Sequence, residues 1–259
     1  MREPRSVLIT GASSGIGAAL AREYARPGAV LGLSGRDRER LATVSADCRE
    51  RGARVVDACI DITDAAAVAA WAARIEEVAP IDLAIANAGI QGGLWRGGAG
   101  EALDEVHRVF ATNVGGVYNT VYAVLPGMRE RKAGQIALVG SLAGLRGLPF
   151  SPGYCASKAA VLAYGEALRG WLAAEGIRVA VILPGFVETR LSDTVSGPKP
   201  LMMSAQRAAG IIYRGLRRER DLIPLPYRMY LAARLLQAVP RRLADGVLRR
   251  IRVDIRPYD

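Results

Sequence analysis

The stretch "SVLITGASSGIGAALAREYA" (residues 6–25) decides the fold, because an apolar run, a glycine-rich turn and an amphipathic stretch follow one another directly. The spacing predicts a buried strand over 6–10 and a helix over 16–25. Glycines in this turn allow a tight bend, a close approach to phosphate and close helix packing, and the helix N-terminus favours an anion. The pattern predicts a dinucleotide site with Gly11, Ser13, Ser14, Gly15, Ile16 and Gly17; a turn without a ligand is the alternative.

The rest of the chain repeats this strand–helix alternation. Further strands are predicted over 29–34, 53–60, 82–87, 134–141 and 177–183, and further helices over 64–78 and 157–175. Strands that are apolar on both faces and alternate with helices predict an α/β fold of Rossmann type. We expect a doubly wound, mostly parallel sheet of about seven strands with helices on both faces. The chain is expected to be a single domain, 1–259, with a cofactor-binding and catalytic core over 1–190.

Composition excludes several classes of protein. Of 259 residues, 51% are hydrophobic and 23% charged, which excludes a mainly disordered chain. The sequence holds no apolar run near the roughly 18 residues of a membrane span, and its start lacks the pattern of a secretory signal. Three cysteines without metal-type spacing predict reduced thiols in the cytoplasm and no metal site. The single histidine, His107, is predicted on a helix surface or interface.

The positive charge is concentrated at the C-terminal end. The net charge is +10, and residues 199–259 carry 14 basic and five acidic residues, a net of +9. Residues 1–198 are therefore nearly neutral, with a net charge of +1, and this argues against nucleic acid as a partner. Beyond residue 190 we predict a substrate lid followed by a basic amphipathic extension, with apolar stripes at Leu231, Leu235 and Val239 and at Leu243, Val247 and Ile251. These stripes favour packing on the core or on a neighbouring subunit; peripheral membrane contact through 226–259 is the alternative.

The end of the second predicted strand bears on the choice of cofactor. Arg36 stands where an arginine pairs with the 2′-phosphate of NADP, and Arg38 is placed to assist. Asp37 leaves NAD open, because a carboxylate there would accept from the ribose 2′-hydroxyl. An ordinary surface charge at a helix start is the alternative for Arg36. We therefore favour NADP(H), with NAD(H) as the second choice.

One of the few lysines lies one helical turn from a tyrosine. Only three of the 35 basic residues are lysine, and Lys158 follows Tyr154 by four positions in "SPGYCASKAA" (151–160). An ammonium group on the same helix face favours the phenolate of a tyrosine, whose ordinary pKa near 10 makes it a poor acid or base at neutral pH. An isolated pair at this spacing also arises by chance. Beside the glycine turn, the pair predicts a proton-transfer site.

An ordered series of motifs extends over most of the chain. It comprises "TGASSGIG" (10–17), "DITD" (61–64), "ANAG" (86–89), "NVGG" (113–116), "GSLAG" (140–144), "YCASK" (154–158) and "LPGFVET" (183–189). In this order the chain resembles the single-domain branch of the short-chain dehydrogenase/reductase family over residues 5–190. The resemblance implies an NAD(P)-dependent enzyme that interconverts a carbonyl and a secondary alcohol, and a homodimer or homotetramer.

The resemblance also implies catalytic roles. Tyr154 would be the general acid in reduction and the base in oxidation, and Lys158 would lower its pKa and hold the nicotinamide ribose. Ser141 would bind the substrate oxygen and stabilise developing charge. Asn113 would hold a water that joins Lys158 to solvent. These four residues are the expected catalytic set.

Further cofactor contacts follow from the same resemblance. Asp61 would bind the adenine amino group, with Ile62 close to the ring. Asn87 would brace the sheet, and the backbone of Ala88 and Gly89 would line the adenosine ribose. The nicotinamide carboxamide would be oriented by Pro184, Gly185, Val187 and Thr189.

The family's substrate loops correspond here to 90–100, 142–150 and 190–205. They contribute mostly apolar side chains, namely Trp95, Leu142, Leu145, Leu148, Phe150, Phe186, Leu191, Met202 and Met203. This set predicts a hydrophobic small-molecule substrate, and 191–204 is predicted to be a mobile lid. A cofactor-binding sensor or scaffold without turnover is the alternative function. Sugar-nucleotide epimerisation fits poorly, because little chain remains for a substrate domain.

Overall fold

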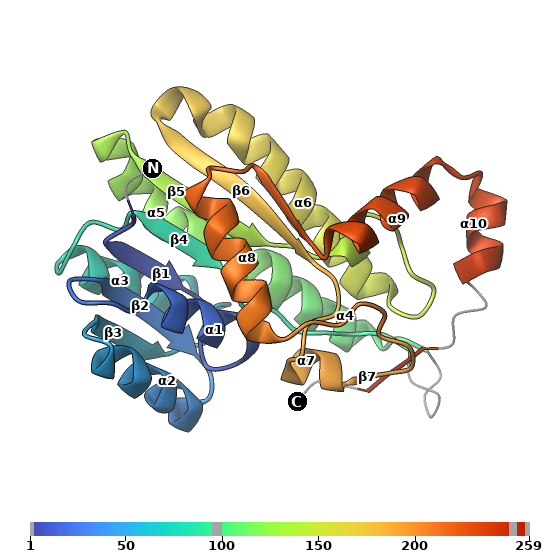
Figure 1. Ribbon diagram of the computed structural model, residues 1–259, viewed down its shortest axis with the longest axis horizontal. Helices are drawn as coiled ribbons and strands as arrows, with labels where there is room; N and C mark the ends of the chain where they lie inside the picture. The colour runs from blue at the N-terminus through green and yellow to red at the C-terminus, as the bar shows by residue number, and fades with distance from the viewer. Residues whose placement is uncertain (1–2, 95–99, 249–252, 257–259) are drawn as a thin grey trace.

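Seven parallel strands form the central sheet of the computed structural model, which describes residues 3–94, 100–248 and 253–256 (Figure 1). The strands are β1 (Ser6–Ile9), β2 (Val30–Gly35), β3 (Arg54–Cys59), β4 (Leu83–Ala86), β5 (Gly134–Val139), β6 (Ile177–Pro184) and β8 (Leu222–Leu225). Their order is β3-β2-β1-β4-β5-β6-β8, so the direction of winding reverses between β1 and β4. The predicted Rossmann-type sheet is confirmed.

Helices cover both faces of the sheet. On one face lie α1 (Gly15–Tyr24), α2 (Arg38–Glu50) and α8 (Ala205–Arg217); on the other lie α3 (Ala65–Glu76), α5 (Gly116–Arg131) and α6 (Pro152–Leu172). Two buried clusters fill the layers: Leu20 and Leu31 belong to the first, and Trp71 and Leu138 to the second. Because both faces of the strands are buried, their apolar runs are continuous.

Local sequence signals set several helix starts. Asp37 caps α2 by accepting a hydrogen bond from the Arg40 N–H at 2.9 Å, and Asp64 caps α3 in the same way through the Ala67 N–H at 3.0 Å. Helix α6 begins at Pro152, five residues before the predicted start, because proline is favoured in a first helical turn. Its earlier start places Tyr154 on the helix itself. Between α4 (Leu103–Phe110) and α5 the chain forms a π-helical turn, η1, over Ala111–Gly115.

The part of the chain beyond residue 190 contributes both to the sheet and to the rim of the site. Strand β8 was not among the predicted runs; it has only four residues, one of them Pro224, and lies at the sheet edge, where proline is tolerated. Helix α7 (Arg190–Asp193) leads into β7 (Val195–Ser196), which pairs antiparallel with β9 (Asp254–Ile255). The C-terminal strand therefore lies against the segment predicted as a lid.

Helices α9 (Tyr227–Ala238) and α10 (Arg241–Leu248) extend away from the sheet at one end of the molecule (Figure 1). Leu231, Leu235, Val239 and Leu243 are all exposed, so the predicted packing of these stripe residues on the chain's own core is wrong. A four-residue spacing aligns Leu231 and Leu235 on one exposed side of α9, whereas Val239 lies at the end of that helix and Leu243 on α10. The Val247 side chain and Ile251 lie outside the described residues. No helix in the described ranges has the length and apolar character needed to cross a bilayer, and His107 is exposed on α4, as predicted.

Candidate active site

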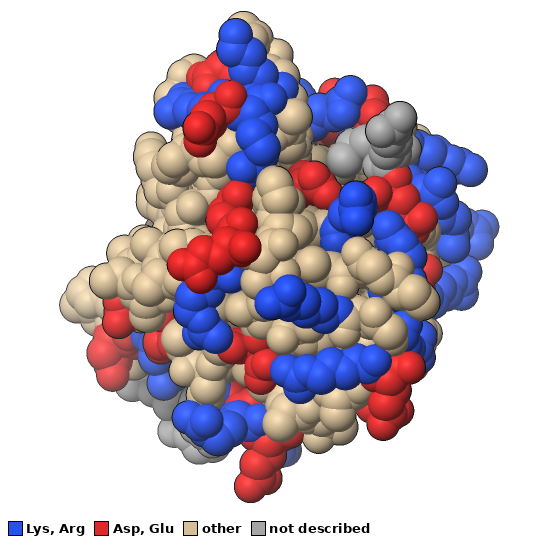
Figure 2. Space-filling view, turned by 90° about the vertical axis from the view of Figure 1, so that its left-hand side faces the viewer, with Lys and Arg blue, Asp and Glu red and all other residues tan. Residues whose placement is uncertain are grey.

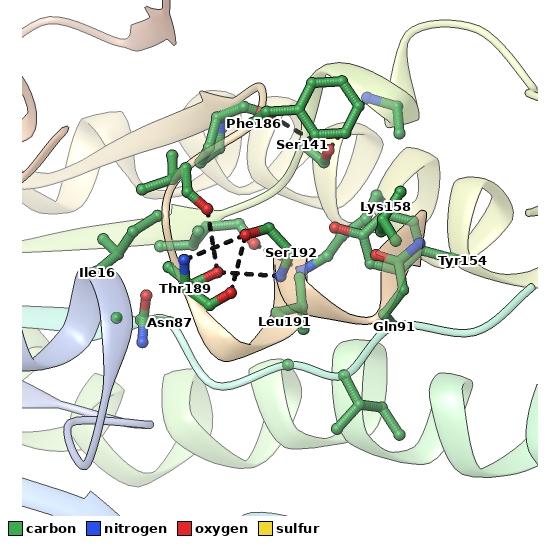
Figure 3. Close-up of a pocket in the computed structure, with 18 of the residues that line it drawn as sticks. Ile16, Asn87, Gln91, Ser141, Tyr154, Lys158, Phe186, Thr189, Leu191 and Ser192 are labelled. Carbon is green, nitrogen blue, oxygen red and sulfur yellow. Dashed lines mark hydrogen bonds between the residues drawn. The ribbon is translucent and has the colours of Figure 1, made fainter. Parts of the chain in front are cut away.

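A cavity of about 1080 Å³ lies at the carboxyl ends of the strands, where the winding of the sheet reverses. It extends from the glycine turn after β1 to the side of α9. Figure 3 shows Ile16 and Asn87 at one end, Tyr154 and Lys158 at the other, and Thr189 and Leu191 between them. Open α/β sheets bind their ligands at this position.

The glycine turn fits a dinucleotide by its backbone geometry. Gly11 and Gly15 have φ values of +67° and +54°, in the left-handed region that favours glycine. A Cβ atom on Gly11 would lie 2.8 Å from the Ala88 Cα, and one on Gly15 would lie 2.7 Å from the Thr189 Cγ2. The N-cap residue of α1, Ser14, makes no capping bond with its side chain, so the first N–H groups of the helix face the cavity uncapped. Such a helix start binds a pyrophosphate.

Asn87 braces this turn. Its Nδ2 donates to the carbonyl oxygens of Thr10 and Gly11 at 2.9 and 3.2 Å. In return, the Thr10 hydroxyl oxygen accepts from the backbone N–H groups of Asn87 and Ala88 at 3.0 and 3.1 Å. These four bonds join the ends of β1 and β4, and with Gly89 this segment lines the cavity.

The end of β2 presents arginines to the cavity. Arg36, which lines it, is exposed directly after the strand. Asp37 lines the cavity as well, but its carboxylate also caps α2 and pairs with the Arg40 guanidinium at 2.9 Å. Arg40 also lines the cavity, whereas Arg38, the predicted assistant, does not. Sequence reasoning missed Arg40, although its i, i+3 spacing from the cap residue was a usable signal.

The two residues predicted to contact adenine lie together at the edge of the cavity. Asp61 and Ile62 follow β3 and line the cavity. The Asp61 Oδ1 accepts from both the N–H and the hydroxyl of Thr63, each at 2.8 Å, which holds the carboxylate in one orientation. Ile62 is buried against Gly116 at the start of α5.

Ser141, Tyr154 and Lys158 meet at the other end of the cavity (Figure 3). Ser141 follows β5; its hydroxyl donates to the Pro184 carbonyl oxygen at 3.4 Å and accepts from the Ala143 N–H at 3.1 Å, and it lies beside the Tyr154 side chain. The Lys158 Nζ donates to the Val139 carbonyl oxygen at 3.0 Å and lies 5.8 Å from the centroid of the Tyr154 ring. The structure thus brings together three side chains that the sequence separates by up to 17 positions.

In the protein without a cofactor, burial is the largest cause of the pKa shifts of Tyr154 and Lys158. Burial raises the pKa of Tyr154 to about 12, although hydrogen bonding to the neighbouring Ser141 acts in the opposite direction and lowers this pKa. Burial also lowers the pKa of Lys158 to about 8, because an ammonium group is costly to desolvate. The expected lowering of the Tyr154 pKa by Lys158 is therefore not seen here. Desolvation of both groups outweighs the attraction across the helix turn.

Asn113 lies in the π-helical turn η1 and is fully buried. Its Oδ1 accepts from the Ile90 N–H at 2.8 Å, and its Nδ2 donates to the Ile90 carbonyl and the Ser157 hydroxyl, both at 3.0 Å. The side chain is thus occupied in joining η1, the segment after β4 and α6. A water held by this residue would have to bind its backbone.

The segment after β6 forms the cavity wall opposite the glycine turn. Pro184, Gly185, Val187 and Thr189 all line it, as predicted. The Gly185 N–H donates to the Leu225 carbonyl oxygen of β8 at 2.6 Å, and Val187 forms a bridge with Met203. Thr189 caps α7 through a reciprocal pair of bonds with Ser192. The path of this segment is therefore set by tertiary pairing.

The substrate end is mainly apolar, but its lining differs from the prediction. Leu142, Leu148, Phe150, Phe186 and Leu191 line it, whereas Leu145, Met202 and Met203 do not, and Trp95 lies outside the described residues. Met203 is buried in the core instead. The structure adds polar residues from two of the predicted loops, Gln91 and Arg146, and residues outside the predicted loops, Met229, Ala233, Leu236 and Val253. Those from α9 and the C-terminal strand were missed because no local pattern links them to the cavity.

A dinucleotide cradle, a tyrosine and lysine one helical turn apart, and a serine beside them define an NAD(P)-dependent oxidoreductase. Comparison with known proteins agrees: the family profile described as short chain dehydrogenase matches residues 5–199. The chain belongs to the short-chain dehydrogenase/reductase family.

The relatives cover from three quarters to nearly all of the chain. An uncharacterized oxidoreductase of Myxococcus xanthus is 35% identical over 253 residues, covering 96% of this chain and 98% of the relative. Ketoacyl reductase HetN of Nostoc sp. is 34% identical over 200 residues, 75% of this chain and 69% of that protein.

Solved structures bind either cofactor. A family member from Burkholderia phymatum in complex with NAD has a TM-score of 0.83 at 26% identity, covering 100% of both chains. A short-chain dehydrogenase from Sphingobium yanoikuyae in complex with NADPH has a TM-score of 0.75 at 29% identity, covering 95% of this chain and 96% of that one.

Proposed function

We propose that this chain is an NADP(H)-dependent oxidoreductase that interconverts a carbonyl group and a secondary alcohol on a hydrophobic small molecule. The observation that carries the proposal is the meeting of Ser141, Tyr154 and Lys158 at the apolar end of a cavity whose other end fits a dinucleotide. When bound, the cofactor would supply or accept the hydride. Asp61 and Ile62 would hold its adenine, the glycine turn its phosphates, and Pro184 to Thr189 its carboxamide.

The protein groups then handle the proton. In this mechanism the Ser141 hydroxyl turns from the Pro184 carbonyl oxygen to donate to the substrate oxygen and orient it, and the Tyr154 Oη gives its proton to that oxygen in reduction. Lys158 stabilises the phenolate that is left, since an ammonium group at this distance offsets the negative charge. With a pKa of about 8, Lys158 can also pass a proton on near neutral pH. We propose that Asn113 completes the relay through a water on its backbone.

Tyr154→Phe tests this role. The variant keeps the ring and its packing but removes the proton, so turnover should fall by at least about a hundredfold. Cofactor affinity should stay within about twofold, because the phenylalanine ring preserves the cavity. The measurements are NADPH absorbance with a panel of hydrophobic ketones, and fluorescence titration of NADPH. Unchanged turnover would refute the mechanism.

The preference for NADP rests on the two arginines at the end of β2. Arg36 directly follows β2, and Arg40 lies in the first turn of α2; both line the cavity. Asp37 lines it too, but its carboxylate is held by the start of α2 and by Arg40. Arg36→Asp should weaken NADPH binding by about tenfold or more while leaving NADH binding within about threefold, because only NADPH carries the 2′-phosphate. Equal effects on both cofactors would remove the assigned role of Arg36.

A second copy of this chain is the expected partner. The outer face of α5 and α6 exposes Tyr118, Tyr122 and Trp171 at 40%, 58% and 50%, and the Tyr118 ring meets that of Tyr164 at 4.6 Å between centroids. Such an aromatic face favours an interface. Light scattering would show a dimer or tetramer; a monomer at all concentrations would contradict this assignment.

We propose that the chain forms a single domain and is located in the cytoplasm. We propose residues 1–259 as a single domain, since β8 joins a sheet otherwise built from residues before 190. Cys48, Cys59 and Cys155 are free thiols in the structure, which suits the reducing cytoplasm.

A further inference from the structure

Helix α9 has two apolar faces. One lines the substrate end of the cavity with Met229, Ala233 and Leu236. The other exposes Tyr227, Leu231 and Leu235, whose side chains are 61%, 44% and 70% accessible. These three are spaced four residues apart, so they share one side of the helix.

Exposed apolar side chains continue into α10. Val239, at the C-terminal end of α9, and Leu243, on α10, are also exposed, at 38% and 64%. We call these five residues, Tyr227, Leu231, Leu235, Val239 and Leu243, the α9–α10 patch. Five large apolar side chains exposed on two consecutive helices at one end of the molecule are more than the scattered exposure of an ordinary surface. The patch therefore marks a contact with something apolar.

The charge around the patch is positive and unbalanced. Arg228, Arg234, Arg241 and Arg242 are all exposed, and within the part of the chain that the structure describes none of them makes an ion pair. The one acidic residue of α9 and α10, Asp245, pairs with Arg146 at 2.5 Å. The surface differs at the other end of the molecule, where Figure 2 shows acidic and basic side chains interspersed.

These observations favour an anionic membrane surface over other occupants. A two-fold contact between two copies of the patch would bring its unpaired arginines against one another. An acidic protein would match the arginines but would not by itself explain an apolar row over two helices. A bilayer interface satisfies both features, because apolar side chains enter the acyl boundary while guanidinium groups meet lipid phosphates. No described helix crosses a bilayer, so the contact is peripheral.

We propose that the α9–α10 patch docks the protein on an anionic membrane, and that the cavity behind α9 takes its hydrophobic substrate from that bilayer. The docking stands on the patch and its arginines alone. The delivery of substrate rests on the proposed function. It follows from the position of α9, which separates the patch from the cavity by the thickness of one helix, so a substrate dissolved in lipid has a short path to Tyr154.

Vesicle co-sedimentation tests the docking. The full chain is mixed with phosphatidylcholine vesicles with or without phosphatidylglycerol, and the bound fraction is measured. Wild type should bind the anionic vesicles and lose affinity with added salt. Leu235→Asp should weaken binding by at least about tenfold, and Arg234→Gln by about fivefold. Leu103→Asp is the matched control, since Leu103 is exposed to 69% on α4, away from the patch.

Turnover of a water-soluble ketone separates the two proposals. Leu235→Asp should leave it unchanged, because the Leu235 side chain faces away from the cavity. With a ketone dissolved in anionic vesicles, the same variant should show at least a tenfold lower kcat/KM than Leu103→Asp. No turnover of any ketone by wild type would refute the proposed function while leaving docking measurable.

Three results would overturn the docking proposal. The first is wild type that does not sediment with anionic vesicles. The second is Leu235→Asp that binds them as well as wild type does. The third is a change of oligomeric state in Leu235→Asp by light scattering without any vesicle binding by wild type, which would assign the patch to a second copy of the chain.

Discussion

Lys158 is predicted to lower the stability of the folded chain at neutral pH, and the effect should fade as the pH rises. Burial lowers its pKa from 10.5 to about 8, while the unfolded chain keeps the ordinary value. The folded protein thus binds fewer protons at this residue between the two values, so stability rises with pH across that window. At about 1.36 kcal/mol per pH unit, the full cost of the buried ammonium below pH 8 is about 3 kcal/mol.

Lys158→Met tests this value, because methionine is unbranched and uncharged and only one atom shorter than lysine. The variant removes the buried charge but also the bond of 3.0 Å to the Val139 carbonyl oxygen, which costs about 1 kcal/mol at any pH. The reliable quantity is therefore the pH dependence of the difference between the two proteins. From pH 7 to about pH 9.5, wild type should gain about 2 kcal/mol of unfolding free energy relative to the variant.

Urea unfolding followed by circular dichroism, in the absence of cofactor, measures this difference at several pH values. Lys132→Met is the matched control, because Lys132 is exposed and its replacement should leave the pH dependence of stability unchanged. A difference between wild type and Lys158→Met that stays constant from pH 7 to about pH 9.5 would refute the reasoning. Turnover by Lys158→Met should be lost at every pH.

Two substitutions probe the packing around the site. In Gly89→Ala, the new Cβ would lie 3.0 Å from the Asn113 Oδ1 and 3.3 Å from the Lys158 Nζ, so stability should fall by about 1–3 kcal/mol in urea unfolding; Gly170→Ala, with open space around it, should not lose stability. Ile255→Asp places a carboxylate at a site 1% exposed and should unpair β9 from β7, which would raise KM for substrate while leaving the cofactor dissociation constant unchanged; equal changes in both would contradict this role.

Local patterns were sufficient for the cofactor end of the site. The glycine turn, Asn87, Asp61 and the segment after β6 lie where the sequence predicted, because each directly follows a strand, and parallel strands end at the same edge of the sheet. Tyr154 and Lys158 were also predictable from a local pattern, because residues four positions apart on a helix lie on the same face whatever the rest of the fold is.

The sequence by itself thus determined the class of fold, the order of its parts and the side chains that we propose to react. Only the tertiary structure decided which side chains complete the substrate end, since α9 and Val253 reach the cavity through contacts between residues far apart in the chain. It also decided the direction of the pKa shifts of Tyr154 and Lys158. A spacing of four residues states that two groups are close, but desolvation depends on everything packed around them.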